Sequence, residues 1–162
     1  QQALCLLGSM MNRVLYPNVI SFNTAMTACE RGEQWPVALV LFNDMRRLGL
    51  KPRADTYNAV MSAFATGQQP SAVFKLVAVM QTQGVRPDLV TYNTAISACG
   101  TWASCWEVSV ELMEAMLRGR LRPDVITHSS VIRALGRGRQ WRRALLQLER
   151  MQQQHVQPNM VT

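Results

Sequence analysis

Long apolar runs, turn-forming residues and charge are all scarce in this sequence of 162 residues. No apolar stretch reaches the ~18 residues that a membrane-spanning helix requires, and no signal-peptide pattern opens the chain. With nine glycines and seven prolines, the chain is not of low complexity. Charged residues make up 17% and apolar residues 48%, a balance that argues against intrinsic disorder and is typical of a chain with a sizeable core.

Cysteine pairs and catalytic clusters are also lacking. The cysteines Cys5, Cys29, Cys99 and Cys105 form no C-x-x-C pair and have no His partners at zinc-ligand spacing. Cys29 and Cys99 are therefore predicted to be small apolar core residues, which fits a reducing compartment. No Ser-His-Asp set, carboxylate pair or phosphate-binding loop is visible. We expect no enzyme activity, cofactor or metal in this chain, while a catalytic domain elsewhere in the protein stays open.

The charge is basic and unevenly distributed. Lys and Arg number 17 against 10 Asp and Glu, and nine arginines but only two acids lie between Arg118 and Arg150. Such a stretch is typical of a surface that attracts phosphate, as in nucleic-acid binding. It is equally compatible with a solvated helix face that has no partner, and the charge alone leaves both interpretations open.

The chain contains an internal repeat. The segment V-I-S-F-N-T-A-M-T-A-C, which starts at Val19, resembles L-V-T-Y-N-T-A-I-S-A-C, which starts at Leu89. Five prolines and five methionines recur at the same steps of 35, 35, 36 and 35 residues: Pro17, Pro52, Pro87, Pro123 and Pro158, and Met10, Met45, Met80, Met116 and Met151. Several columns with one period, and with the same single-residue insertion, identify a tandem repeat.

The full repeats are 19–53, 54–88, 89–124 and 125–159. Residues 1–18 match the second half of a repeat and are expected to contain its second helix. Residues 160–162 begin a further repeat, so more repeats are expected at both ends. The inserted residue falls within 100–105, in the turn between two expected helices, where insertion is tolerated.

Each repeat is predicted to be a helix pair. In repeat 19–53, apolar residues recur at helical spacing from Ser21 to Arg31, and Gly32 is a helix stop. A second helix is predicted from Pro36 to about Leu48, where the first-turn proline costs no hydrogen bond. The fold class is therefore all-α, a right-handed superhelical solenoid of nine stacked helices, with the recurring Met, Leu and Trp columns in its core.

These columns carry a family resemblance. The pattern V-x-[ST]-[FY]-N-x-x-[IM]-x-A at repeat starts, with M-x-x-x-G-[LV]-[KR]-P at repeat ends, resembles the plain 35-residue type of pentatricopeptide repeat along essentially the whole chain. The fourth repeat departs most, because His128 replaces the aromatic residue and Ser129 the asparagine. The resemblance implies single-stranded RNA as the partner, read at one base per repeat by two or three side chains.

The resemblance also implies roles for individual residues. The residue after the aromatic and the last residue of each repeat would specify the base: Asn23 with Arg53, Asn58 with Asp88, Asn93 with Asp124, and Ser129 with Asn159. The second residue of a repeat would sandwich bases: Ile20, Val90 and Ile126. Arg31 and Arg137 would face phosphate, and His128 would be a groove residue.

The implied RNA core is 5′-N-U-U-A-3′. Asn with Asp resembles the uracil-favouring pair, and Ser with Asn the adenine-favouring pair. Arg53 has no settled assignment, so the first base stays open. Asp55 stands in the sandwiching column, where an acid against a base and its phosphate is unfavourable, and this puts stacking there in doubt.

Two wider expectations follow. The family acts mostly on transcripts in mitochondria or plastids, in processing, stabilisation, editing or translation, and this chain is expected to do the same. The main alternative is a protein-interaction solenoid of the tetratricopeptide kind. That repeat has a period of about 34 residues and carries its tryptophan in the first helix. Here the period is 35 and the tryptophans Trp35, Trp106 and Trp141 open the second helices.

Overall fold

The computed structural model describes residues 18–100 and 105–153, and these contain eight α-helices and no strand. Eight of the nine expected helices are therefore present, and the remaining one, within residues 1–18, lies outside the described residues. The chain divides into two compact units, residues 1–86 and 87–162, which we describe separately.

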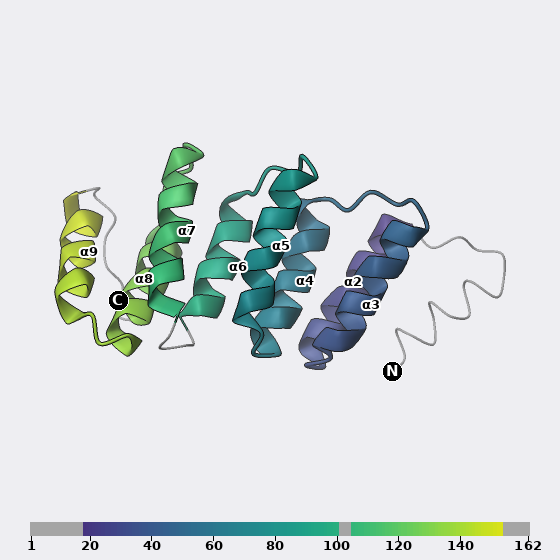
Figure 1. The fold of residues 1–162 in the computed structure, drawn as a ribbon, viewed down its shortest axis with the longest axis horizontal. Coiled ribbons are helices and arrows are strands. Elements are labelled where there is room, and N and C mark those ends of the chain that lie inside the picture. Colours follow the sequence, from purple (N-terminus) through teal and green to yellow (C-terminus); the bar gives the residue numbers. More distant parts are fainter. Residues whose placement is uncertain (1–17, 101–104, 154–162) are drawn as a thin grey trace. The chain divides into compact units, whose positions relative to one another are not determined.

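The first unit contains two helix pairs (Figure 1). They are α2 (Val19–Arg31) with α3 (Trp35–Arg47), and α4 (Ala54–Thr66) with α5 (Pro70–Thr82). Helix α2 packs against both α3 and α4, and α4 also contacts α3 and α5. The first helix of one pair therefore lies beside the first helix of the next, as stacked repeats require.

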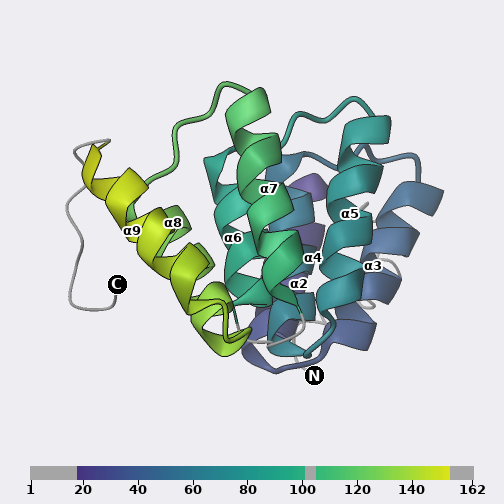
Figure 2. The ribbon, with the colours of Figure 1, turned by 60° about the vertical axis from the view of Figure 1, so that its left-hand side comes forward.

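The second unit repeats this arrangement with α6 (Leu89–Cys99), α7 (Trp106–Arg118), α8 (Val125–Arg137) and α9 (Trp141–Gln153). Helix α6 packs against α7 and α8, and α8 packs against α7 and α9. Figure 2 shows α8 beside α9 in this unit. The inserted residue expected within 100–105 falls mostly on residues 101–104, which lie outside the described residues.

Capping residues fix where the first helices begin. Asn18, Asp88 and Asp124 precede α2, α6 and α8, and each accepts a hydrogen bond from the backbone N–H three residues on, at 2.9, 2.8 and 2.8 Å. Such a bond satisfies one of the helix N–H groups that have no partner within the helix. Helix α2 consequently begins at Val19, two residues before the Ser21 start that the apolar spacing predicts.

The core is built from the repeated columns. Met45, Met80, Met116 and Met151 have no exposed side-chain surface, so the prediction for this column is confirmed. The two cysteines predicted in the core are also buried, and Cys99 is fully so. Burial, followed by the neighbouring thiol of Cys105, raises the pKa of the Cys99 thiol to about 12. A thiol with this pKa stays protonated at neutral pH and behaves as a small apolar side chain.

The tryptophans that open the second helices pack on the ends of the following first helices. A Cβ atom at Gly67, after α4, would overlap the indole of Trp35, whose ring also lies 5.8 Å from that of Phe64. A Cβ atom at Gly138, after α8, would likewise overlap the indole of Trp106. Because glycine has no side chain, the indole can lie directly on the helix end.

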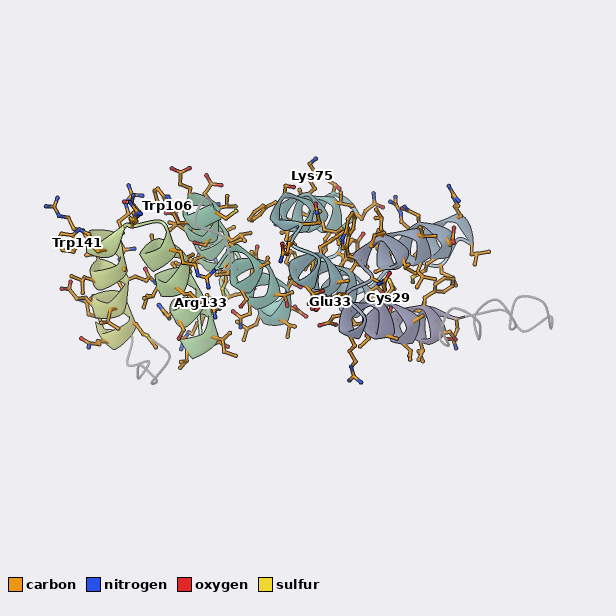
Figure 3. The ribbon with its side chains drawn as sticks, turned by 90° about the horizontal axis from the view of Figure 1, so that it is seen from below. Cys29, Glu33, Lys75, Trp106, Arg133 and Trp141 are labelled. Carbon is orange, nitrogen blue, oxygen red and sulfur yellow. The ribbon has the colours of Figure 1, made fainter. Side chains whose placement is uncertain are left out.

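Trp141 departs from this rule and from its predicted core position. Its side chain is 61% exposed, and it lies at the outer edge of α9 (Figure 3). Trp35 and Trp106 are half-buried because a glycine-ended helix packs against each of them. Within the described residues no such helix packs on Trp141, and the guanidinium of Arg142 lies over its ring at 5.1 Å.

The prediction that His128 is a groove residue is wrong. Its side chain is fully buried, at the place that Phe22, Tyr57 and Tyr92 occupy in the other first helices. The amide nitrogen of Gln147 lies 2.9 Å from His128 Nδ1 and 3.1 Å from the sulfur of Met113. Gln147 in turn occupies the column of the buried Leu41, Leu76 and Leu112. A buried aromatic residue and a buried leucine in the other repeats therefore correspond here to a hydrogen-bonded polar pair, in which each side chain gives the other a partner inside the core.

Candidate nucleic-acid interface

The candidate base-contacting residues lie on the first helix of each pair. In the first turn, three aliphatic side chains point to solvent: Ile20 is 72% exposed, and Val90 and Ile126 are each 57% exposed. One turn further along stand Asn23, Asn58, Asn93 and Ser129. Exposed aliphatic groups beside polar ones give α2, α6 and α8 a surface on which a flat, polar-edged ring can lie.

A hollow of about 540 Å³ separates parts of α2 and α4 in the first unit. It brings together the predicted sandwiching residue Ile20, the predicted base-specifying residue Asn23 and the predicted phosphate-facing residue Arg31. Asp55 and Ala59 line it from α4, and the remaining lining residues are Thr24, Thr27 and Ala28. Three residues that were selected separately from the repeat columns thus meet in one cavity.

The asparagines are not helix caps. The side-chain oxygens of Asn23 and Asn58 are buried, and neither finds a hydrogen-bond partner among the described residues. The capping of α2 is performed by Asn18 instead. A buried acceptor without a partner destabilises a fold by about 1–3 kcal/mol, so such an atom is unusual unless a ligand or water satisfies it.

Asn93 shows a different state, because its side chain is held at both ends. Its amide nitrogen donates to the two carboxylate oxygens of Asp124, at 3.2 Å each, and its oxygen accepts from the hydroxyl of Thr127 at 2.6 Å. Only this orientation of the amide pairs its donor with the carboxylate and its acceptor with the hydroxyl. The predicted pair Asn93 and Asp124 is therefore in direct contact and fixed in orientation.

Asp124 has two roles at once. It caps α8 through the backbone N–H of Thr127 and it contacts Asn93. Burial by itself raises the pKa of its carboxyl group, but hydrogen bonds from the backbone and hydroxyl of Thr127 and from Asn93 outweigh burial, so the pKa is lowered. The carboxylate is thus ionised at neutral pH and keeps its capacity to accept hydrogen bonds.

The sequence reasoning missed this capping role and the part of the buried threonines. Thr91 and Thr127 are fully buried, and each bonds the aspartate three positions earlier, Asp88 or Asp124. The signal was present as the repeated D-x-x-T spacing, which resembles a capping box. Arg53 stands in the same column but cannot accept such a bond, and there the hydroxyl of Thr56 accepts from the Arg53 backbone N–H at 3.2 Å.

Several predicted site residues stay predictions. The pair Asn58 and Asp88 spans the two separately described units, and Asn159 lies outside the described residues. The hydroxyl of Ser129 donates to the backbone oxygen of Val125 at 2.6 Å, within its own helix. Arg137 is the last residue of α8 and is exposed.

The described part of the chain has neither a metal-binding cluster nor a membrane-spanning helix. Among the described residues, no group of three or more His, Cys, Asp or Glu side chains could hold a metal ion. The helices in the same part of the chain are too short or too polar to cross a membrane.

Comparison with known proteins gives consistent structural neighbours. The chain is similar to the pentatricopeptide repeat protein PPR10 from maize, with 20% identity and a TM-score of 0.83, over 94% of this chain and 22% of that one. PPR10 in complex with an 18-nt psaJ RNA element gives a TM-score of 0.80, with the same identity and coverage. The PPR domain of Arabidopsis thaliana protein-only RNase P 1, in complex with tRNA, gives 15% identity and a TM-score of 0.84, over 98% of this chain and 83% of that one.

The chain thus spans about a fifth of the PPR10 chain. These likenesses confirm the predicted all-α repeat solenoid as the fold. A search of curated proteins finds no match. Two family models match the sequence: the pentatricopeptide repeat domain over residues 40–101 and 111–162, and the PPR repeat over residues 20–50. The matches cover most of the sequence, and the chain belongs to the pentatricopeptide repeat family.

Proposed function

We propose that this chain binds single-stranded RNA along its first helices, with one base to each helix pair. The observation that carries the proposal is the state of the repeated asparagines. Within residues 18–100 and 105–153, the buried amide oxygens of Asn23 and Asn58 find no hydrogen-bond partner, and Asn93 is oriented by Asp124 and Thr127. An amide offers a donor and an acceptor on adjacent atoms, which suits the edge of an unpaired base.

Stacking would be supplied by the exposed aliphatic side chains. Ile20, Val90 and Ile126 stand one turn before the base-specifying position in their helices, so each can cover one face of a base whose edge meets the polar residue. Arg31 lines the same hollow as Ile20 and Asn23, where its charge would attract the RNA backbone. The RNA-bound relatives support this class of ligand.

The proposed base order is 5′-N-U-U-A-3′. The carboxylate of Asp124 occupies one amide hydrogen of Asn93 and leaves the other free for a carbonyl oxygen of uracil. The assignments of uracil to Asn58 with Asp88, and of adenine to Ser129 with Asn159, follow the family pattern. The first base is treated separately below.

Binding by these residues alone is expected to be weak and sensitive to salt. Stacking contributes roughly 1–3 kcal/mol per base, or about 4–12 kcal/mol for four bases. Association costs roughly 4–15 kcal/mol in lost motion, so little net affinity remains. Tight binding would need a longer array, in keeping with the larger size of PPR10.

The decisive experiment measures fluorescence anisotropy with short labelled RNAs at low and moderate salt. One strand carries AUUA in an unstructured context, and a second carries AGGC in the same context. The test variant is Asn58→Ala/Asn93→Ala, and the matched control is Asn43→Ala, an exposed asparagine on the second helix α3. We expect the AUUA strand to bind more tightly, the test variant to lose this preference and the control to keep it.

Two other outcomes would contradict part or all of this proposal. Equal, steeply salt-dependent affinity for all strands and for double-stranded RNA would leave only the basic charge and refute the base assignments. Absence of binding at high protein concentration would favour the protein-interaction solenoid.

We also propose that the full protein acts on transcripts in mitochondria or plastids, as expected from the family. Imaging of the full-length protein fused to a fluorescent protein tests this, and a nuclear or diffuse cytosolic signal would contradict it.

A further inference from the structure

The hollow between α2 and α4 has a charge arrangement unlike the rest of the chain. At the position where Asp88 and Asp124 cap the later first helices, Arg53 precedes α4. In the column where Ile20, Val90 and Ile126 expose aliphatic side chains, it has Asp55. The arginine and the aspartate pair with each other, since Arg53 Nε lies 3.8 Å from Asp55 Oδ1. A carboxylate is thus present at the start of α4, but it belongs to Asp55, two residues after the position that Asp88 and Asp124 occupy in the later repeats.

Asp55 lines the hollow that Asn23 also lines. No aspartate stands where it could contact Asn23 as Asp124 contacts Asn93, because that position holds Arg53. The buried side-chain oxygen of Asn23 finds no hydrogen-bond partner among the described residues. The acceptors that the hollow presents are therefore the two oxygens of the Asp55 carboxylate, because the oxygen of Asn23 is itself buried. The side chain of Asp55 is 61% exposed, which leaves its carboxylate accessible to a ligand.

This acceptor set discriminates between the bases. Guanine carries an N1–H and a 2-amino group side by side, so it offers three N–H hydrogens along one edge. Adenine and cytosine offer two hydrogens from a single amino group, and uracil offers one between two carbonyl oxygens. A carboxylate accepts two parallel N–H bonds well, and charge-assisted bonds of this type are stronger than neutral ones.

We propose that this hollow is a guanine site. The carboxylate of Asp55 accepts from N1–H and from one hydrogen of the 2-amino group, so that two parallel bonds hold the base. Arg53 pairs with the carboxylate, and Arg31 lines the same cavity, so the positive charges offset the repulsion between Asp55 and the RNA phosphates. This inference rests on the proposed RNA binding and extends the core to 5′-G-U-U-A-3′.

The first test compares four RNAs that differ only in the base before UUA. We expect guanine at that position to be preferred by about tenfold, a typical value for one good bidentate contact. Inosine, which lacks the 2-amino group, should lose most of this preference. A 7-deazaguanine in the same place should keep it, because the proposed contacts do not use N7.

Substitutions in the protein test whether Asp55 causes the preference for guanine. Asp55→Asn and Asp55→Val should both abolish the preference for guanine while the UUA portion still binds, and Asp55→Val restores an aliphatic residue in this column. The matched control is Asp44→Asn, a partly exposed, salt-bridged aspartate on the second helix α3, which should leave the preference unchanged. Circular dichroism of each variant verifies that the helices are intact.

The two proposals fail in different ways. If UUA is selected but the first base makes no difference, or if Asp55→Val leaves a guanine preference in place, the guanine site is refuted and the RNA-binding proposal stands. If none of the RNAs binds, both are refuted. A pyrimidine preference at the first position would also overturn the guanine assignment, because a pyrimidine edge has no ring N–H beside an amino group and so cannot give the carboxylate two parallel bonds.

Discussion

The amide nitrogen of Asn93 on α6 reaches the carboxylate of Asp124, which caps α8, at 3.2 Å from each oxygen. One aspartate thus holds the start of a helix and the orientation of a side chain on the neighbouring first helix. Helix capping and the orientation of Asn93 are therefore coupled at this residue, and substitutions can separate them.

Asp124→Ala should lower the free energy of unfolding by about 0.5–2 kcal/mol, the usual loss when a helix cap is removed. Asp124→Asn should be milder, because an amide oxygen can still accept from the Thr127 N–H. Urea unfolding followed by circular dichroism measures both. Equal destabilisation by the two variants would show that the contact with Asn93, rather than the cap, carries the effect.

The same carboxylate should make the fold sensitive to acid. Its pKa is lowered below the ordinary value of an aspartate in the folded state, because the hydrogen bonds outweigh burial. The stabilisation is present above the unfolded-state pKa and is lost as the pH falls through the lower folded-state pKa. Urea unfolding between pH 7 and pH 3 should show a steeper loss in the wild type than in Asp124→Asn. Parallel curves would contradict the assignment.

The glycine beneath Trp106 gives a stability prediction with an internal control. Gly138→Ala should destabilise the second unit by about 1–3 kcal/mol, because the added methyl overlaps the indole and the packing must shift. Gly136→Ala lies two residues earlier, in α8, where nothing described approaches an added Cβ within 4 Å. It should be neutral or stabilising, by up to about 1 kcal/mol. Thermal unfolding distinguishes them, and equal melting temperatures would argue against the tryptophan contact.

The buried pair of His128 and Gln147 is predicted to be strongly non-additive. His128→Tyr alone leaves the Gln147 amide without this partner and crowds it, with an expected cost of about 1–3 kcal/mol. Gln147→Leu alone should likewise destabilise the fold. The double variant places a tyrosine and a leucine at the two positions where the preceding repeat has the buried Tyr92 and Leu112, so it should be at least as stable as the wild type. A double-mutant cycle by urea unfolding measures the coupling, and additive losses would refute it.

Repetition made most of the fold predictable from sequence. Helix starts were off by one or two residues, at Val19 instead of Ser21 and at Trp35 instead of Pro36, because apolar spacing marks the buried face and not the cap. Column matching also placed the candidate residues on first helices.

Comparison of equivalent positions between repeats does not predict the role of a residue when a second substitution, on another helix, compensates for the first. The prediction of His128 as a groove residue is wrong because Gln147 supplies a hydrogen-bond partner for its buried side chain from another helix. In the same way, Asp55 looked unfavourable by itself, and only the structure places it across a hollow from Asn23. Each of these depends on a second residue that lies far from the first in the sequence.

The tryptophan–glycine contact repeats at every second helix pair. Trp35 and Trp106 are separated by as many residues as Gly67 and Gly138, while Pro70 takes the tryptophan column in the intervening repeat. One such contact lies inside each compact unit. Glycine nevertheless follows all four described first helices, at Gly32, Gly67, Gly100 and Gly138. A repeat that carries the tryptophan can therefore be followed by a copy of itself and still meet a glycine at the helix end, so growth of this array by gene duplication is not limited to pairs of repeats.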